Sequence, residues 1–188
     1  MPRKKTFQAM REAERVGPYD DMPMLPEDLQ LQVHLSRNNR PQPFHQIFGK
    51  DTLLFLLSGG GAVEMKDSPV ARFTIKPGDC VYIPAGVPHR IVPAEESVML
   101  RYKPQPAGLE GVAWYCTNCS TELYRRAWNA DTAVSQAMFH EVCHEYVAEA
   151  TRRKCPKCGV MQTPPDLDGF RWTEVVRELG GSAAAATP

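Results

Sequence analysis

Short apolar segments, separated by Gly and Pro, recur through the first hundred residues of the chain. Residues 29–35 alternate apolar and polar side chains, which is the period of a half-buried strand. The other apolar segments are short and mostly continuous, and they cover residues 53–57, 62–65, 70–75, 80–83, 90–92 and 97–102. Strands of this length and spacing, with no helical pattern between them, predict a sandwich or a barrel.

Apolar residues at helical spacing occur near the beginning and towards the end of the chain. Residues 7–16 predict a short amphipathic helix that Pro18 ends. Residues 131–153 predict a longer helix, and residues 169–179 predict a third, for which Asp168 is a candidate N-cap. We expect the third helix to pack on its own barrel, with a second subunit as the alternative.

The most informative stretch of the barrel region is residues 78–89. Gly78 and Asp79 predict a tight turn before the strand at 80–83, and a corner at Pro84 and Gly86 then delivers His89 to the next strand. The spacing G-x5-P-x-G-x2-H resembles the second motif of the cupin superfamily, which aims a histidine into a small β-barrel. His34, on the polar side of residues 29–35, is expected at the surface, or alternatively in a wet cavity.

Two C-x2-C pairs follow the barrel region, separated by 35 residues. Cys116 and Cys119 form the first pair, and Cys155 and Cys158 form the second. Four thiolates in two short loops suit a tetrahedral Zn or rubredoxin-like Fe site, and such a closed site is structural rather than catalytic. Cys80 and Cys143 lie in apolar sequence and are expected to be buried, inert thiols.

The predicted helix at 131–153 contains a weaker pattern, H-E-x-x-H, formed by His140, Glu141 and His144. Two histidines one helical turn apart can bind zinc, with the glutamate as a base. Only three positions of the pattern are fixed, so a solvated helix face is the stronger interpretation.

Charge and composition exclude several classes of function. The chain has 188 residues, 43% of them hydrophobic, which suits one main domain with small appendages. Lys plus Arg equals Asp plus Glu, 22 against 22, so bulk charge recruits neither nucleic acid nor a membrane surface. No run is long enough to span a membrane, and the basic start lacks an apolar signal region. We therefore expect a cytoplasmic protein with reduced cysteines.

The order of these parts resembles bacterial 3-hydroxyanthranilate 3,4-dioxygenase, a cupin. The resemblance rests on the His89 motif, on residues 106–116 and on R-R-K-C-P-x-C-G at 152–159. It implies opening of the ring of a small aromatic acid with Fe(II) and O2. It also implies that His89 is the last histidine of a His, Glu, His triad, that the four cysteines are a separate site, and that Arg40 grips the substrate carboxylate.

The first half of the triad departs from the family pattern. Thr52 stands at the glutamate position, and Gln46, or His45 after a one-residue slip, stands at the first histidine. A shifted catalytic Fe(II) set of His45, Asp51 and His89 is one hypothesis. A second is a metal-free barrel that binds a small molecule or a partner protein, with only the cysteines holding metal. A third is acid-base chemistry by His89 and His45 without a metal.

Together these patterns predict a mainly β protein with a cupin-type barrel, a double-stranded β-helix. We expect a barrel with an N-terminal helix over residues 1–106, a four-cysteine rubredoxin-like extension over 107–163, and a helix with a flexible tail over 164–188. The family resemblance further implies a homodimer.

Overall fold

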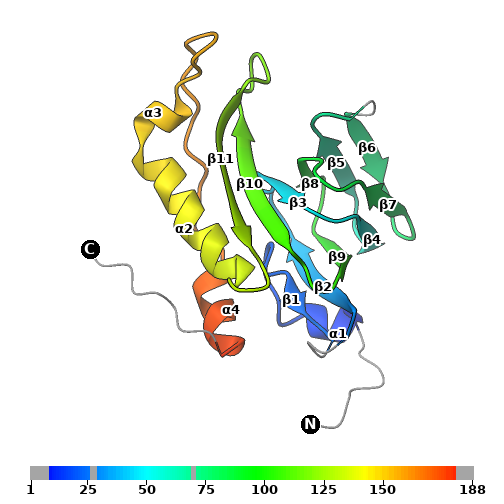
Figure 1. Cartoon of the computed structure of the whole chain (residues 1–188). Helices are drawn as coiled ribbons and strands as arrows, with labels where there is room; N and C mark the ends of the chain where they lie inside the picture. Colours follow the sequence, from blue (N-terminus) through cyan, green and yellow to red (C-terminus); the bar gives the residue numbers. More distant parts are fainter. Residues whose placement is uncertain (1–8, 26–28, 69–70, 181–188) are drawn as a thin grey trace.

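The computed structural model describes residues 9–25, 29–68 and 71–180, which form two antiparallel sheets that face each other (Figure 1). The first sheet has, in spatial order, β1 (Met22–Pro23), β2 (Leu31–Asn38), β9 (Ser97–Pro104), β4 (Thr52–Ser58) and β7 (Cys80–Ile83). The second has β11 (Glu122–Asn129), β10 (Leu109–Tyr115), β3 (His45–Phe48), β8 (His89–Pro93), β5 (Gly61–Met65) and β6 (Arg72–Ile75). The predicted mainly β, cupin-type fold is confirmed.

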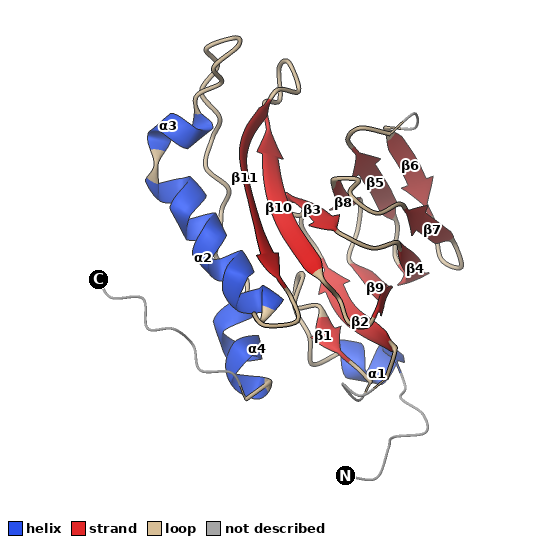
Figure 2. Ribbon diagram, viewed as in Figure 1, coloured by secondary structure: helices blue, strands red, loops and turns tan. Residues whose placement is uncertain are grey.

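The helices lie outside the two sheets (Figure 2). They are α1 (Ala9–Ala13), α2 (Ser135–Ala148), α3 (Ala150–Arg153) and α4 (Trp172–Glu178). α2 runs beside β10 and β11, and α4 packs on α2. The three predicted helices are therefore present, although residues 7 and 8 of the first lie outside the described residues.

Apolar side chains fill two separate cores. The first lies between the sheets and consists mainly of aliphatic residues, Leu54, Leu56, Val63, Ile75, Ile83, Ile91 and Met99. The second is aromatic and lies under α2 and α4, where Trp114 stacks on Tyr146 at a ring-centroid distance of 4.2 Å. Trp172 of α4 belongs to the same core, so the last helix packs on its own chain.

The hairpin of β10 and β11 was not predicted. β10 pairs with β3 through residues 110–113, so this hairpin continues the second sheet. The segment that carries the cysteines therefore begins as part of the barrel wall. In Figure 1 the hairpin rises from the barrel towards the loop in which the first C-x2-C pair lies.

β2 turns its apolar side chains outward and its polar side chains towards the barrel interior. Val33 and Leu35 face outward, where they pack with Ala13 and Val16 from the N-terminal segment. The polar positions of β2 consequently face the space between the sheets, because successive side chains of a strand point to opposite sides.

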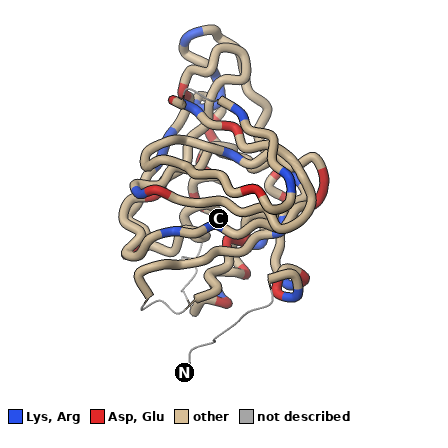
Figure 3. The backbone as a smooth tube through the Cα atoms, turned by 90° about the vertical axis from the view of Figure 1, so that its right-hand side faces the viewer, with Lys and Arg blue, Asp and Glu red and all other residues tan. Residues whose placement is uncertain are grey.

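The surface carries both signs of charge. Figure 3 shows acidic and basic residues interspersed along the strands on one side of the molecule. No helix within residues 9–25, 29–68 and 71–180 has the length and apolar character that crossing a membrane requires.

Candidate functional site

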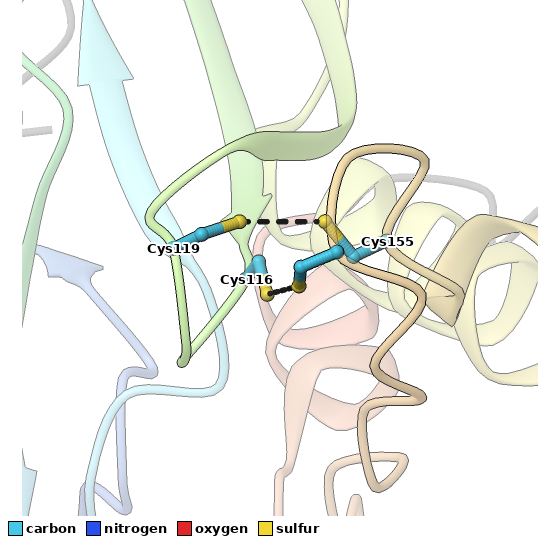
Figure 4. A group of neighbouring side chains, drawn as sticks. Cys116, Cys119 and Cys155 are labelled. Carbon is cyan, nitrogen blue, oxygen red and sulfur yellow. Dashed lines mark hydrogen bonds between the residues drawn. The ribbon is translucent and has the colours of Figure 1, made fainter.

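The four predicted cysteines meet at one point, which we call the cysteine centre. Their Sγ atoms all lie within 4.8 Å of one another. Cys119 Sγ lies 3.5 Å from Cys155 Sγ, and Cys116 Sγ lies 3.5 Å from Cys158 Sγ (Figure 4). None of the cysteines forms a disulfide among the described residues. This geometry suits four thiolates around one ion.

The two C-x2-C loops have the same backbone construction. The amide of Ser120 donates to the Cys116 carbonyl at 2.9 Å, and the amide of Gly159 donates to the Cys155 carbonyl at 2.9 Å. The residue after the second cysteine has positive φ in both loops, 57° at Ser120 and 74° at Gly159. Each loop thereby turns both of its sulfurs to one side.

Neighbouring groups make the sulfurs chemically unequal. The Thr121 hydroxyl beside Cys119 lowers the pKa of that thiol to about 6, whereas burial raises the pKa of Cys116 to about 11. Gln162 Nε2 lies 3.6 Å from Cys116 Sγ and can donate to it. The donor set thus fits Zn²⁺ or Fe, and such an ion would crosslink the two loops. Four thiolates would fill its coordination positions, so the site would be structural rather than catalytic.

His89 lies inside the barrel, as predicted. Its side chain is fully buried, and it sits on β8 directly opposite Gln46 of β3. Nδ1 lies 3.2 Å from the Val87 carbonyl and therefore carries the proton. The lone pair of Nε2 points further into the barrel, where a cupin would place its metal ion.

A guanidinium occupies the place beside that lone pair. Arg101 of β9 is 3% exposed, and its Nη1 donates to His89 Nε2 at 2.8 Å. The Phe48 ring lies beside both groups: its centroid is 5.6 Å from that of the His89 ring and 4.8 Å from Arg101 Cζ. Burial, and then the charge of Arg101, hold the pKa of His89 well below its usual range.

The rest of the expected iron set does not converge on His89. Gln46, not His45, faces the interior, because neighbouring residues of β3 point to opposite sides. Asp51 is exposed and accepts a 2.8 Å hydrogen bond from the Ala85 amide. Thr52 points inward at the glutamate position, 3% exposed. The shifted triad therefore does not form in this structure.

These residues do not fit an iron ion at His89. A metal needs the Nε2 lone pair that Arg101 already occupies, and a second cation there would meet the Arg101 charge at close range. A threonine hydroxyl cannot supply the negative charge of the missing carboxylate. Because Gln46 rather than His45 faces the interior beside His89, the two histidines lie on different sides of the sheet and do not form an acid-base pair.

Polar side chains continue from Arg101 to the mouth of the barrel. Lys103 lies two residues further along β9, and its Nζ pairs with Glu110 Oε1 at 2.8 Å, both side chains being at least 95% buried. Glu110 Oε2 also accepts from Ser135 Oγ at 2.7 Å. His34 lies opposite Arg101 on β2. Contrary to the surface prediction, His34 faces inward.

This end of the barrel opens into a cavity of about 880 Å³, which we call the mouth cavity. His34, Lys103, Glu110, Gln136 and Phe139 are among its lining residues. His34 Nδ1 lies 2.8 Å from the Asp21 carbonyl, while His34 Nε2 is buried without a hydrogen-bond partner among the described residues. Burial and the charge of Lys103 hold the pKa of His34 well below its usual range.

Arg40 lies on the outside of the barrel rather than at its mouth. It donates to the Asp168 carbonyl, and its guanidinium carbon lies 5.7 Å from the Phe170 ring centroid. A second cavity, of about 560 Å³, is lined by both Arg40 and His45. Two of the predicted site residues are thus neighbours, but on a different face from His89.

The remaining motif residues take separate places. The rings of His140 and His144 lie 4.4 Å apart on α2, but Glu141 pairs with Arg126 at 2.8 Å. Among the described residues, the four cysteines form the only cluster of three or more His, Cys, Asp or Glu ligands close enough for one ion. Cys143 is buried as predicted, whereas Cys80 is exposed, which corrects that expectation.

Sequence reasoning missed Arg101 and Lys103. A signal was available, because residues 98, 100 and 102 of the same strand are apolar. Two cations that alternate with apolar residues on a barrel strand must face the interior if the apolar residues face a helix outside.

Comparisons with known proteins agree with this fold. A family model for the cupin domain matches residues 43–102. A 3-hydroxyanthranilate 3,4-dioxygenase of Bacillus thuringiensis is 27% identical over 125 residues, 64% of this chain and 68% of that protein. One of Meyerozyma guilliermondii is 32% identical over 129 residues, 65% and 66% of the two chains.

Among solved structures, a hydroquinone 1,2-dioxygenase matches with a TM-score of 0.46 and 18% identity, over 53% of this chain and 73% of that one. The family match over residues 43–102 and the two facing sheets show that the chain contains a cupin domain. The chain is related to the 3-hydroxyanthranilate 3,4-dioxygenases.

Proposed function

We propose that this cupin binds a small organic acid in its mouth cavity and that its barrel holds no metal ion. The observation that carries the proposal is the 2.8 Å contact from Arg101 Nη1 to His89 Nε2. A fixed, always protonated guanidinium takes the position that a metal cation would need. The barrel keeps a positive charge at its centre, but this charge belongs to a side chain.

The cavity offers the groups that such an acid needs. Lys103 Nζ has three donors, and Glu110 is the only carboxylate among the described residues within salt-bridge distance of it. The remaining N–H donors of Lys103 Nζ can bind a ligand carboxylate. His34 Nε2 is an acceptor, since Nδ1 bonds the Asp21 carbonyl, and it can pair with a hydroxyl or amine. The ring of an aromatic acid would pack on Phe139 and the apolar lining near Leu29.

The interior behind the cavity favours a polar occupant. Thr52 Oγ1 and Arg101 Nε are buried, and neither has a hydrogen-bond partner among residues 9–25, 29–68 and 71–180. Both lie on strands adjacent to each other, β4 and β9. A buried polar atom without a partner costs about 1–3 kcal/mol, so water or a ligand group that reaches these atoms gains that energy.

The relatives' names support an aromatic acid. A 3-hydroxyanthranilate carries a carboxylate, a hydroxyl and an amine on one ring, and these match the donor of Lys103 and the acceptor of His34. The proposed work of this chain is therefore recognition of an aminohydroxy-aromatic acid or a close analogue. Burial holds the pKa of both His34 and His89 well below the usual range, so both imidazoles are neutral near pH 7.

Oxidation of such an acid with Fe(II) and O2 is the second candidate, and the relation to the dioxygenases is what favours it. It requires Arg101 to leave His89 and additional ligands to replace Thr52 and Gln46. The residues around His89, as the structure places them, do not fit iron.

Metal content of freshly purified protein separates the two candidates. We expect one ion per chain, retained in His89→Ala and lost in Cys155→Ser. Isothermal titration with 3-hydroxyanthranilate should then show binding to the wild type and at least about tenfold weaker binding to Lys103→Met. A second, iron-like ion that disappears in His89→Ala would contradict the proposal and would justify O2-uptake assays.

We also propose a homodimer, which the family resemblance implies, and a cytoplasmic location. Light scattering on the purified chain tests the first. A mass equal to one chain at micromolar concentration would overturn it.

A further inference from the structure

Two neighbouring elements, α2 and β10, run from the mouth cavity to the cysteine centre. The first residues of α2 line the mouth cavity, and the second cysteine pair follows its far end through the short helix α3. With 14 residues, α2 is about 21 Å long. β10 runs beside α2 in the same direction, from Glu110 at the mouth cavity to Tyr115, directly before Cys116 (Figure 1). Each C-x2-C loop therefore continues from one of two elements that begin at the mouth cavity.

The first residue of α2 holds the carboxylate that pairs with Lys103. Ser135 Oγ donates to Glu110 Oε2 at 2.7 Å, and the other oxygen of Glu110 accepts from Lys103 Nζ at 2.8 Å. The Ser135 hydroxyl has one proton, which Glu110 takes, and its oxygen accepts from Trp128 Nε1 at 3.2 Å. The start of α2 and the end of β11 thereby fix the Glu110 carboxylate and, through it, the Lys103 ammonium.

The second residue of α2 fixes the other proposed ligand-binding group, His34. Gln136 Nε2 donates to the Asp20 and Asp21 carbonyls, at 3.0 Å in both cases. His34 Nδ1 donates to the same Asp21 carbonyl at 2.8 Å. Gln136 is 4% exposed, so these contacts are shielded from bulk water. A movement of the start of α2 would therefore move the carbonyl that orients the His34 ring.

The far end of α2 is attached to both cysteine pairs. Arg153, two residues before Cys155, donates from Nη1 to the Tyr146 carbonyl in the last turn of α2 at 3.2 Å. The Tyr146 ring stacks at 4.2 Å on Trp114, which lies two residues before Cys116. An ion on the four cysteines would crosslink the far end of β10 to the segment that follows α2. The hydrogen bond from Ser135 to Glu110 joins the same two elements at their near ends.

The packing of α2 allows it to transmit a displacement from one end to the other. Four of its side chains, Phe139, Val142, Cys143 and Tyr146, are at most 2% exposed and belong to the aromatic core. A close-packed interior of this kind is nearly incompressible and passes strain on rather than absorbing it. Release of the far end should therefore tilt the helix as a unit and disturb the contacts of Ser135 and Gln136.

We propose that α2 couples the two sites, so that the mouth cavity binds its acid most tightly when the four cysteines hold an ion. Ser135 is the positioning residue of this coupling, because its hydroxyl joins the start of α2 to the carboxylate that holds Lys103. A cavity whose binding groups are already oriented loses less entropy when the acid binds. The inference rests on the function proposed above for the mouth cavity. Coupling is reciprocal, so a bound acid raises the ion affinity of the cysteines by the same factor.

The first test compares metal-loaded with metal-free protein, the latter prepared with a chelator under reducing conditions. Isothermal titration with 3-hydroxyanthranilate as the probe should give binding at least about fivefold weaker to the metal-free protein. Competition with a chelator measures the ion affinity of the cysteines. We expect that affinity to rise by the same factor when the probe saturates the mouth cavity.

Three variants test the role of Ser135. In Ser135→Ala the probe should change the ion affinity by less than about twofold, whereas Ser135→Thr keeps a hydroxyl and should restore the coupling. Thr173→Ala removes a hydroxyl of α4 that donates to Glu174, and it should behave as wild type. Equal coupling in Ser135→Ala and wild type would overturn the proposal. This comparison holds even if the metal-free chain unfolds, because linkage through folding alone acts equally on both proteins.

Nuclear magnetic resonance of the histidine ring nitrogens tests the coupling without any ligand. We expect the His34 signals, assigned with His34→Gln, to differ between metal-loaded and metal-free protein. The His89 signals should stay unchanged and show that the barrel is folded. A probe that does not bind metal-loaded wild type would overturn the function proposed for the mouth cavity. Unchanged His34 signals, or equal binding of the probe with and without the ion, would overturn the coupling.

Discussion

The cysteine centre and the barrel interior differ in how they treat positive charge. At the cysteine centre four sulfurs converge within 4.8 Å and leave room only for a cation. In the barrel, Arg101 already supplies the cation, and it donates to the very nitrogen that a metal would use. The cysteine centre is thus arranged to bind a cation, whereas in the barrel a side chain supplies the positive charge.

This contrast shows that a fold and its metal site can separate. The barrel retains its sheets and the corner that buries His89, because those depend on apolar packing and turn residues. Its ligand set depends on single side chains, and a change of glutamate to threonine or histidine to glutamine leaves the packing intact. A four-cysteine site needs all of its thiolates to hold one ion, so we expect the loss of one cysteine to disturb these loops more.

Loss of one cysteine should give the largest effect of any single change. Cys155→Ser removes a ligand, and we expect loss of the bound ion and of several kcal/mol of unfolding free energy, since structural zinc contributes about 10–16 kcal/mol in small zinc domains. Elemental analysis and thermal unfolding measure this. Cys80→Ser, at an exposed thiol on β7, is the control and should change neither. Equal stability of Cys155→Ser and wild type would remove the contrast.

The buried ion pair in the barrel should rank next. Glu110→Gln leaves the Lys103 charge without its partner, and we expect a loss of about 3–5 kcal/mol in urea unfolding. Glu122→Gln breaks a surface pair with Arg125 whose side chains are 40% and 39% exposed, and it should cost less than about 1 kcal/mol. A loss from Glu110→Gln no greater than that of Glu122→Gln would show that the barrel interior is wet and well screened.

A fall in pH below about 6.5 should destabilise the folded protein through three buried histidines. The pKa values of His34, His45 and His89 are all lowered by folding, that of His45 to about 3. The unfolded chain therefore binds more protons below about pH 6.5, so this stability is present above that pH and is lost as pH falls. Each histidine contributes about 1.4 kcal/mol per pH unit, or about 4 kcal/mol for all three between about pH 7 and 5.5.

Urea unfolding at those two pH values, with metal content checked at both, measures the loss. His34→Gln should reduce the pH dependence by about one third. A free energy of unfolding that does not change over this range would mean that the three rings are solvated in the folded protein.

The smallest effects should distinguish the two cysteine loops. Gly159 has a φ of 74° and open space where a Cβ would project, so Gly159→Ala should cost about 1 kcal/mol through the backbone alone. Ser120 has a φ of 57° at the equivalent position, so Ser120→Gly should stabilise by a similar or smaller amount. In chemical unfolding of the metal-loaded protein, we expect the two variants to change the free energy of unfolding in opposite directions. Changes in the same direction would contradict the equivalence of the two loops.

Much of the fold was predictable because its strands are short apolar runs between turn residues. β7 was predicted with its observed bounds, and the spacing up to His89 identified the cupin corner. β10 and β11 were missed for a physical reason. β10 is buried on both sides and contains Gly111, while β11 carries two arginines in succession, so neither shows a period of two.

The candidate site was predictable only where spacing alone defines it. Two C-x2-C pairs specify a metal geometry without knowledge of the fold, and the four sulfurs do converge. The barrel site depends on which face each side chain takes. A shift of one residue reverses that face, which is why His45 and Asp51 were candidates on paper while Gln46 and Thr52 point inward.

The contacts of Tyr19 set an order of events during synthesis. Its carbonyl accepts from Trp172 Nε1 at 3.1 Å, and its ring stacks on Phe170 at 6.1 Å, across 153 residues of sequence for the hydrogen bond. While the ribosome is still making the segment before α4, Tyr19 has been synthesised but lacks its contacts with Phe170 and Trp172. The nascent chain must therefore keep this aromatic core soluble until α4 has been synthesised and can cover it.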